Sequence, residues 1–163
     1  MILEIKTYPE KILKQKAKRV DEIDAGIKKL IDDMVETLYV KKGAGLAANQ
    51  VGALKQIAVI DFGEGLTVLI NPEILSKNGK LVAAEGCLSF PGLELDIKRP
   101  QKILVRYLDK SGKEKKIKAE DLRARVICHE LDHLQGKTLL NRVGFFKRIK
   151  LKRRLKYETK MRT

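Results

Sequence analysis

The sequence is poor in aromatic residues and has no long apolar run. Aromatic residues make up only 5% of a 163-residue chain that is 44% hydrophobic, and tryptophan is absent. The core must therefore be mostly aliphatic, and the length suits one domain over residues 1–163. No stretch of about 18 apolar residues occurs, so we expect no membrane span and no membrane partner. The first residues, Met1-Ile2-Leu3-Glu4, lack the basic start and apolar segment of an export signal.

Cysteine and histidine are scarce, with two residues of each. Two cysteines without an export signal indicate a reducing compartment, where thiols stay free or bind a metal. We therefore expect a cytoplasmic protein. Both histidines belong to one short segment, His129-Glu130-Leu131-Asp132-His133.

This H-E-x-x-H pattern is typical of a metal site on a helix. Residues four apart share one helical face, so both imidazoles can reach one cation. Glu130 lies about a quarter-turn away, close enough to touch a metal-bound water. A buried helix with two ordinary histidines can show the same pattern. The absence of any other histidine favours the metal site.

Acidic residues are too few to balance the bases. The chain has 35 Lys and Arg against 21 Asp and Glu, which gives a net charge of +14. More than half of this excess, +8, lies in the last 19 residues, 145–163. A solvated helix that covers the core is one explanation for this basic segment, and a tail that docks on a polyanion is the other.

Hydrophobic spacing predicts a helix, then several strands, then two helices. Asp24 is the expected N-cap of a helix that ends near Lys41. Its apolar stripe follows helical spacing and consists of Ile27, Leu30, Ile31, Met34, Val35, Leu38 and Tyr39. Alternation and turn residues predict strands at residues 2–6, 56–62, 66–70, 93–98, 103–107 and 113–118.

The ends of these elements are also predicted. Asn71-Pro72 should close the strand 66–70, and Asp121 should cap the helix that carries the histidines. Gly136 is a natural C-cap for that helix, and a basic helix follows at about 144–163. We therefore predict an α+β fold. Its mostly antiparallel sheets pack around the central H-E-x-x-H helix, flanked by an N-terminal amphipathic helix and the basic C-terminal helix.

A glycine-rich stretch, Gly43–Gly52, follows the first predicted helix. It lacks the Gly-Lys-Ser/Thr of a phosphate loop, and no strand precedes it. Gln50 is its one side chain suited to binding a neutral carbonyl. A plain helix-to-strand turn is an equally good interpretation from this stretch alone.

A catalytic metal needs a third protein ligand. A third histidine six residues after His133 is excluded, because that position is Leu139. A downstream carboxylate would have to be Glu158, which lies in the basic tail. Cys87 is the remaining candidate and would give a Cys/His/His site with an open fourth position. Cys128 would complete a closed structural site in an RNA-binding or ribosome-binding module. Its adjacency to His129 favours a buried small residue instead.

Three segments together resemble the motifs of peptide deformylase. Gly43–Gln50 is similar to G-x-G-L-A-A-x-Q, Glu85–Ser89 matches E-G-C-L-S, and His129–His133 matches H-E-x-D-H with Asp132. Their order and spacing, the chain length and the Asn-Pro-Glu at 71–73 also match. The resemblance covers nearly the whole chain.

The resemblance implies a metal held by Cys87, His129 and His133. One divalent ion is expected, with ferrous iron as the physiological metal and zinc, nickel or cobalt as alternatives in purified protein. The implied reaction removes the formyl group from the N-terminal formyl-methionine of new polypeptides in a bacterial cytoplasm. A metal-bound water attacks the formyl carbon.

The remaining roles follow from the same resemblance. Glu130 is expected to transfer the proton, while Gln50 and the backbone N–H of Leu88 bind the formyl oxygen. Gly45, with its neighbours Gly43 and Ala44, is expected to contact the peptide. Ala44 departs from the branched aliphatic residue that is usual in the family, so the preference for methionine is left open.

The basic tail also has a counterpart in this family. In some members such a helix docks on the ribosome, so we expect the ribosome as a partner and no DNA. A peptidase that uses Glu158 as its third ligand would instead cleave internal peptide bonds and would not need Cys87.

Overall fold

The computed structural model describes the backbone of residues 1–162 and the side chains of all of these except Lys160 and Arg162. Thr163, the last residue of the predicted basic helix, lies outside this range. The described residues form one α-helix, then seven strands, then two further α-helices, together with three short 3-10 helices. In chain order they are η1 (Lys11–Lys14), α1 (Ala25–Val40), β1 (Gly45–Ala47), η2 (Ala48–Val51), β2 (Ile57–Ile60), β3 (Thr67–Asn78), β4 (Leu81–Gly86), β5 (Glu94–Arg99), β6 (Lys102–Leu108), β7 (Glu114–Glu120), α2 (Asp121–Leu134), η3 (Leu139–Arg142) and α3 (Phe145–Arg162).

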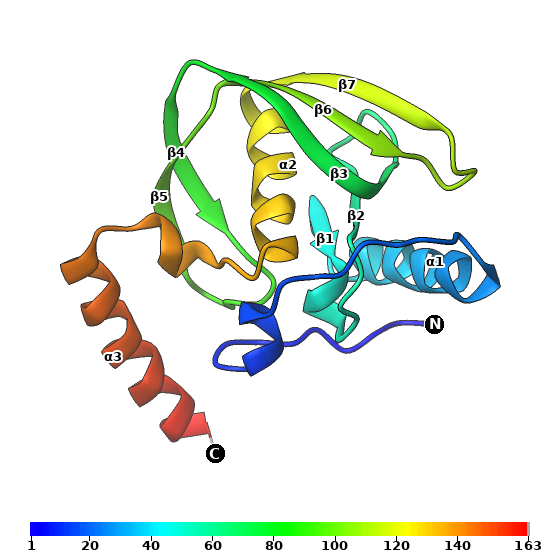
Figure 1. The fold of residues 1–163 in the computed structure, drawn as a ribbon. Helices are drawn as coiled ribbons and strands as arrows, with labels where there is room; N and C mark the ends of the chain where they lie inside the picture. The colour runs from blue at the N-terminus through cyan, green and yellow to red at the C-terminus, as the bar shows by residue number, and fades with distance from the viewer. Residues whose placement is uncertain (163) are drawn as a thin grey trace.

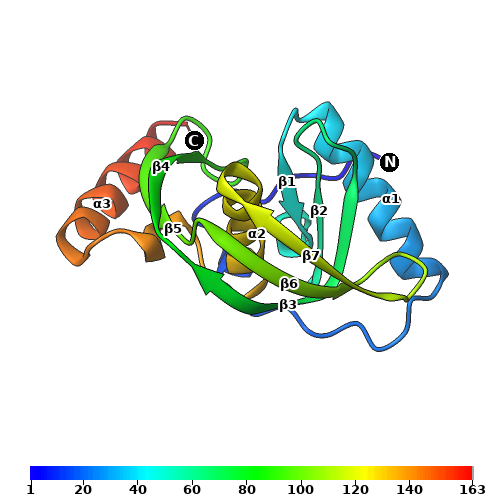
Figure 2. The ribbon, with the colours of Figure 1, turned by 90° about the horizontal axis from the view of Figure 1, so that it is seen from above.

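The strands form two antiparallel sheets. Five strands pair in the order β1-β2-β3-β6-β7, and β4 pairs with β5 in a separate two-stranded sheet. Figure 1 shows α2 between the two sheets, and the view from above shows the five-stranded sheet curving around this helix (Figure 2). The predicted α+β fold with a central histidine-bearing helix is confirmed.

Alternating residues anchor the sheets on α2. In β6, Ile103, Val105 and Tyr107 are buried, and they pack in one cluster with Ile127 and Leu134 of α2. Strand β5 alternates in the same way. This period of two is the pattern of a strand with one face on the core.

Helix α1 closes the far side of the five-stranded sheet. Asp24 caps it as predicted, and its carboxylate accepts a hydrogen bond from the Ile27 amide at 2.7 Å. The predicted stripe packs against β2, with Ile31, Met34 and Leu38 fully buried. Its last member is an exception, because Tyr39 is 52% exposed.

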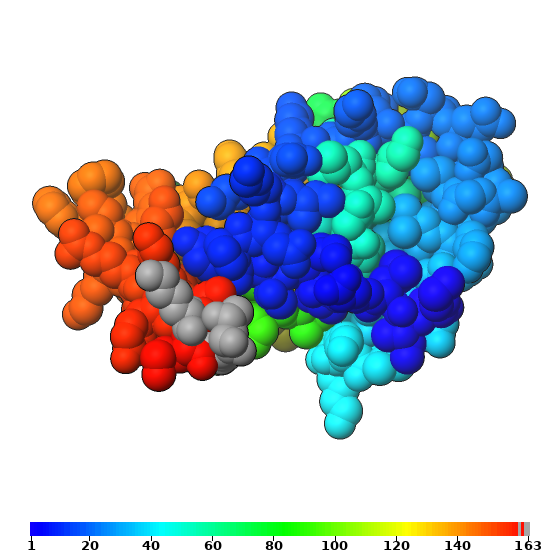
Figure 3. All heavy atoms as spheres, turned by 90° about the horizontal axis from the view of Figure 1, so that it is seen from below, coloured from blue at the N-terminus to red at the C-terminus, as the bar shows by residue number. Residues whose placement is uncertain are grey.

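The first residues do not form the predicted strand 2–6. They run in an extended conformation across the lower face of the molecule (Figure 3), where the amide of Lys6 donates to the Gln50 carbonyl at 2.7 Å. The amide of Tyr8 donates to the Ser89 carbonyl at 2.9 Å. These isolated bonds hold the segment against η2 and the β4–β5 loop without a ladder.

Strand β3 does not end at Asn71-Pro72. It continues to Asn78, with a register shift between Ile70 and Glu73 that accommodates the proline. Asn71 has a φ of 50°, and its side-chain amide bonds both the N–H and the carbonyl of Val20 at 2.8 Å. This contact joins segments 51 residues apart.

The two ends of α2 differ in how well they were predicted. The cap prediction is wrong, because α2 begins at Asp121 and its N-cap is Glu120, which makes no side-chain cap hydrogen bond. The carboxylate of Asp121 instead accepts a hydrogen bond from the side-chain amide of Gln101 at 3.0 Å. Gly136 follows the helix with a φ of 70°, as the C-cap prediction requires.

Helix α3 extends from the body of the molecule (Figure 1). Leu151 and Leu155 pack on Leu139, Leu140 and Val143, while the basic residues of its middle are exposed. Within residues 1–162, no helix combines the length and apolar character that crossing a bilayer would require.

Candidate active site

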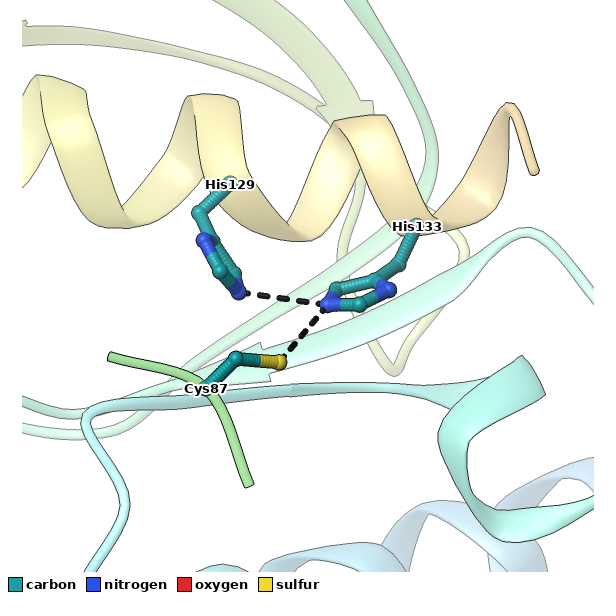
Figure 4. Close-up of side chains that lie close together, drawn as sticks. All are labelled: Cys87, His129 and His133. Atoms are coloured by element: carbon teal, nitrogen blue, oxygen red, sulfur yellow. Dashed lines mark hydrogen bonds between the residues drawn. The ribbon is translucent and has the colours of Figure 1, made fainter. Parts of the chain in front are cut away.

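Two elements bring three metal-binding side chains together. His129 and His133 lie one turn apart on α2, and Cys87 lies directly after β4. The Sγ of Cys87 lies 3.2 Å from Nε2 of His133, which lies 3.1 Å from Nε2 of His129. Figure 4 shows the three side chains converging.

This donor set fits a divalent transition metal. All three ligand atoms lie within 4.8 Å of one another. Adjacent donors around one tetrahedral ion lie about 3.3–3.6 Å apart, given bond lengths of about 2.0–2.3 Å. One thiolate and two imidazoles are ligands that suit zinc and iron. The chain therefore carries a Cys/His/His cluster able to hold a metal.

Glu85 holds the ring of His129 in place. Its carboxylate lies 3.0 Å from Nδ1 of His129, which directs Nε2 toward Cys87. Arg99 donates to both oxygens of Glu85, at 2.8 and 2.9 Å, and Arg125 donates to Oε1 at 2.7 Å. Burial opposes its charge, yet the hydrogen bonds from Arg99 and His129 lower the pKa of Glu85 to about 2. This carboxylate is therefore ionised at neutral pH.

The two imidazoles differ in protonation when no metal is bound. Burial opposes a charge on His129, but its hydrogen bonds with Cys87 and Glu85 raise its pKa to about 10. Burial and the charge of His129 lower the pKa of His133 well below its ordinary value. A metal must displace the proton of His129, because only neutral imidazole is a ligand.

Glu130 is buried beside the cluster and is only 3% exposed. Its Oε2 has no hydrogen-bond partner among the described residues. Burial raises its pKa to about 7, so it can exchange a proton near neutral pH. A carboxylate oxygen left without a partner at such depth points to a ligand or water that completes the site.

Gly45 makes room for Glu130. A Cβ on Gly45 would lie 2.8 Å from both Cγ and Cδ of Glu130, closer than non-bonded carbons approach. Gly45 opens β1, the edge strand of the large sheet. The glycine therefore lets the Glu130 carboxylate lie against the strand edge.

Gln50 faces the same cluster from η2. Its Oε1 accepts from the amide of Ala47 at 2.9 Å, which fixes the orientation of the side-chain amide. Its Nε2 lies 3.1 Å from Oγ of Ser89 and 3.5 Å from Sγ of Cys87. The NH₂ group therefore points to the space beside the thiol, an orientation that a plain turn would not require.

One cavity of about 840 Å³ joins these groups. Its volume suits a short peptide or another small molecule. Nearly all of the predicted site residues line it, including Gly43, Ala44, Gly45, Gln50, Cys87, Leu88, His129 and Glu130. His133 lies behind them and is only 1% exposed.

The two rival ligands lie outside the cluster. Cys128 is buried among apolar side chains of α2 and the large sheet, and burial raises its pKa. Glu158 is on α3, where its carboxylate pairs with Arg154 at 2.7 Å. Neither residue belongs to the group of convergent ligand atoms found in the described part of the chain.

Sequence reasoning gave no role to the charged residues behind the ligands, although Glu85 and Asp132 belong to the matched motifs. Glu85, Arg99, Arg125 and Asp132 are all less than 9% exposed and form one network, in which Arg99 also donates to Asp132. Arg99 gave one signal, because it occupies a buried position in the alternation of β5. A charge at such a position is rarely left unpaired.

Comparisons with known proteins point to one family. The family model described as polypeptide deformylase matches residues 2–148. A peptide deformylase from Thermoanaerobacter sp. (strain X514) is 47% identical over 153 residues, which cover 94% of this chain and 92% of the relative.

Solved structures agree in both fold and coverage. The crystal structure of a peptide deformylase from Legionella pneumophila has a TM-score of 0.92 and 36% identity, and the match covers 99% of this chain and 98% of that one. A peptide deformylase from Ehrlichia chaffeensis in complex with actinonin has a TM-score of 0.91 and 41% identity, with 96% and 97% covered.

Proposed function

The chain belongs to the peptide deformylase family, and from this premise we propose how its residues carry out the reaction. It is a metal-dependent hydrolase that removes the N-formyl group from newly synthesised polypeptides. One thiol and two imidazoles converge beside the Glu130 carboxylate, whose Oε2 has no partner among the described residues. This arrangement is the main support for the roles proposed below.

We propose that Cys87, His129 and His133 hold one divalent ion, which is ferrous iron in the cell. The closeness of their ligand atoms and the soft thiolate support this assignment. A bound dication supplies Lewis acidity, which makes water acidic enough to ionise near neutral pH. Glu85 keeps Nε2 of His129 directed at the ion, with Arg99 and Arg125 balancing its charge.

Glu130 takes a proton from the attacking water and passes it to the amine that leaves. Burial raises its pKa above that of an ordinary carboxyl group, which supports a group that must accept and then release a proton. The products are formate and a polypeptide with a free amino terminus.

Gln50 and the backbone amide of Leu88 bind the oxygen of the formyl group. The fixed orientation of the Gln50 amide supports this role, since its donor points to the cavity without rearrangement. A preorganised donor of this kind is worth about 10²–10³ in rate.

The substrate lies along the open edge of β1. Gly43, Ala44 and Gly45 offer main-chain groups there, and main-chain pairing accepts any sequence. Such recognition suits substrates that share only their first residue. Ala44 leaves space in the cavity wall where a branched residue would narrow it.

We also propose a bacterial cytoplasmic location, one functional domain over residues 1–163, and a ribosome contact through α3. The exposed bases in the middle of α3 support the last point.

The decisive experiment replaces the carboxylate of Glu130 with an amide of nearly the same shape. Glu130→Gln should keep the fold and the metal yet lose nearly all deformylation of formyl-Met-Ala-Ser, because an amide cannot accept the proton. Glu158→Gln is the matched control and should behave like the parent protein. Normal turnover by Glu130→Gln would contradict the role of Glu130.

A further inference from the structure

A second cavity lies on the opposite face of α2. It has a volume of about 340 Å³, near the lower end of small-molecule sites. The α2 residues that line it are Cys128, Leu131, Asp132 and Leu134. Those that line the active-site cavity are Leu122, Arg125, Val126, His129 and Glu130. At about 100° per residue the mean directions of these two sets are roughly opposite. The two cavities share no lining residue.

The second cavity is strongly basic. Its four cationic side chains are Lys77, Arg99, Lys137 and Arg142, and its one carboxylate is Asp132. Arg99 and Arg142 both donate to Asp132, so this carboxylate is already shared between two guanidinium groups. Neither Lys77 nor Lys137 has a salt-bridge partner among the residues that the structure describes.

The sheet register directs Lys77 at the cavity. Lys77 pairs with Ile103, whose side chain is buried, so both residues lie on the face of the sheet that packs against α2. Lys77 is solvent-exposed and lines the cavity, so an anion from solution can reach its ammonium group.

We propose that this cavity binds a small phosphate-bearing anion, held by Lys77, Lys137 and Arg142. A phosphate group carries enough negative charge to pair with the ammonium groups of both Lys77 and Lys137. It can also accept hydrogen bonds from the guanidinium N–H groups of Arg142 that do not bond to Asp132. Arg99 also lines the cavity, but its charge is matched by Glu85 and Asp132, so the proposal does not depend on it. Ion pairs connect this cavity to the active site, because Arg99 pairs both with Asp132 in the cavity wall and with Glu85 behind His129.

The test is a calorimetric titration of the metal-loaded full chain with inorganic phosphate at constant ionic strength. The double variant Lys77→Gln/Lys137→Gln should weaken phosphate binding at this site by about tenfold or more. The matched control, Lys116→Gln/Lys118→Gln, removes the same charge from exposed positions of β7 and should leave binding unchanged. Deformylation should be normal in both double variants, which shows that each is folded.

Three results would overturn the proposal. The first is the absence of saturable binding. The second is equal weakening in both double variants, which would indicate general attraction to a basic protein or binding at the metal. The third is binding of a short RNA but not of inorganic phosphate, which would identify a nucleic-acid contact instead.

Discussion

At the scale of single residues, the site depends on polar groups that are out of contact with water. Glu85, Arg99, Arg125 and Asp132 support the ligands from behind and are almost fully buried. Each charge in the network is matched by an opposite one at hydrogen-bond distance. Removing one partner from such a buried set costs about 3–5 kcal/mol, because an uncompensated charge remains.

Cys87 should control metal binding. Cys87→Ser is expected to lower the metal content and weaken affinity, since a hydroxyl is a poor substitute for a soft thiolate. Metal-to-protein ratios and competition with a chelator measure the effect. Cys128→Ala, one residue from His129 but buried in the apolar cluster, is the matched control. Parental metal content in Cys87→Ser would reject the assignment.

Glu85 should make stability depend on pH in the acid range. Its folded pKa of about 2 lies below its ordinary value of 4.5, so its contribution is complete above 4.5 and is lost as pH falls toward 2. The shift corresponds to about 3 kcal/mol. Urea unfolding of chelator-treated protein should show this loss in the parent and much less of it in Glu85→Gln.

Glu94→Gln provides the control for this measurement. Glu94 lies on the exposed face of β5, so its replacement should leave the acid dependence as it is in the parent. An unchanged acid dependence in Glu85→Gln would show that other carboxylates are responsible.

At the scale of elements, β1 approaches α2 closely because Gly45 has no side chain. Gly45→Ala would push its methyl group into Glu130, as the distances to Cγ and Cδ require. We expect at least a tenfold loss of kcat/KM with the metal retained, because misplacement of a proton carrier is costly. Gly144→Ala is the control, since a Cβ there meets nothing within 4 Å. Full activity in Gly45→Ala would show that Glu130 can move without consequence.

Elements with strong local signals could be predicted from the sequence. The spacing of apolar residues in α1, β5 and β6 predicts which side chains are buried. The start of α1 could be predicted because Asp24 is a common N-cap residue. The end of β3 could not be predicted, because Asn71 is held by Val20 and the proline lies at a register shift. These features depend on partners distant in the chain.

The candidate site divides in the same way. Motif spacing predicted His129 and His133, and exclusion of other ligands left Cys87; the three ligand atoms do lie close together. It gave no role to Arg99 or Arg125, because only the folded chain brings β5 and the first turns of α2 to Glu85. The motif resemblance supplied what spacing alone left open.

At the scale of the whole molecule, charge is unevenly distributed. Helix α3 attaches through Leu151 and Leu155 and exposes its bases to solvent. Removing residues after Gly144 would also uncover Leu139 and Leu140, so that truncation changes the core as well as the charge. Replacing exposed bases tests docking without this complication.

We expect Lys152→Gln/Arg153→Gln/Lys156→Gln to reduce co-sedimentation with ribosomes at low salt. The loss should shrink as salt rises, because exposed charges are screened. Lys113→Gln/Lys116→Gln/Lys118→Gln removes equal charge near and along β7 and is the control. Equal loss in both variants would indicate general attraction to RNA rather than docking by α3.

The network behind the ligands also constrains how such a protein can diverge. Glu85, Arg99 and Asp132 form ion pairs with one another, so replacing any one of them leaves a buried charge without its partner. A tolerated substitution in this network therefore requires a compensating substitution in a partner, whereas the exposed Lys and Arg residues can be replaced individually.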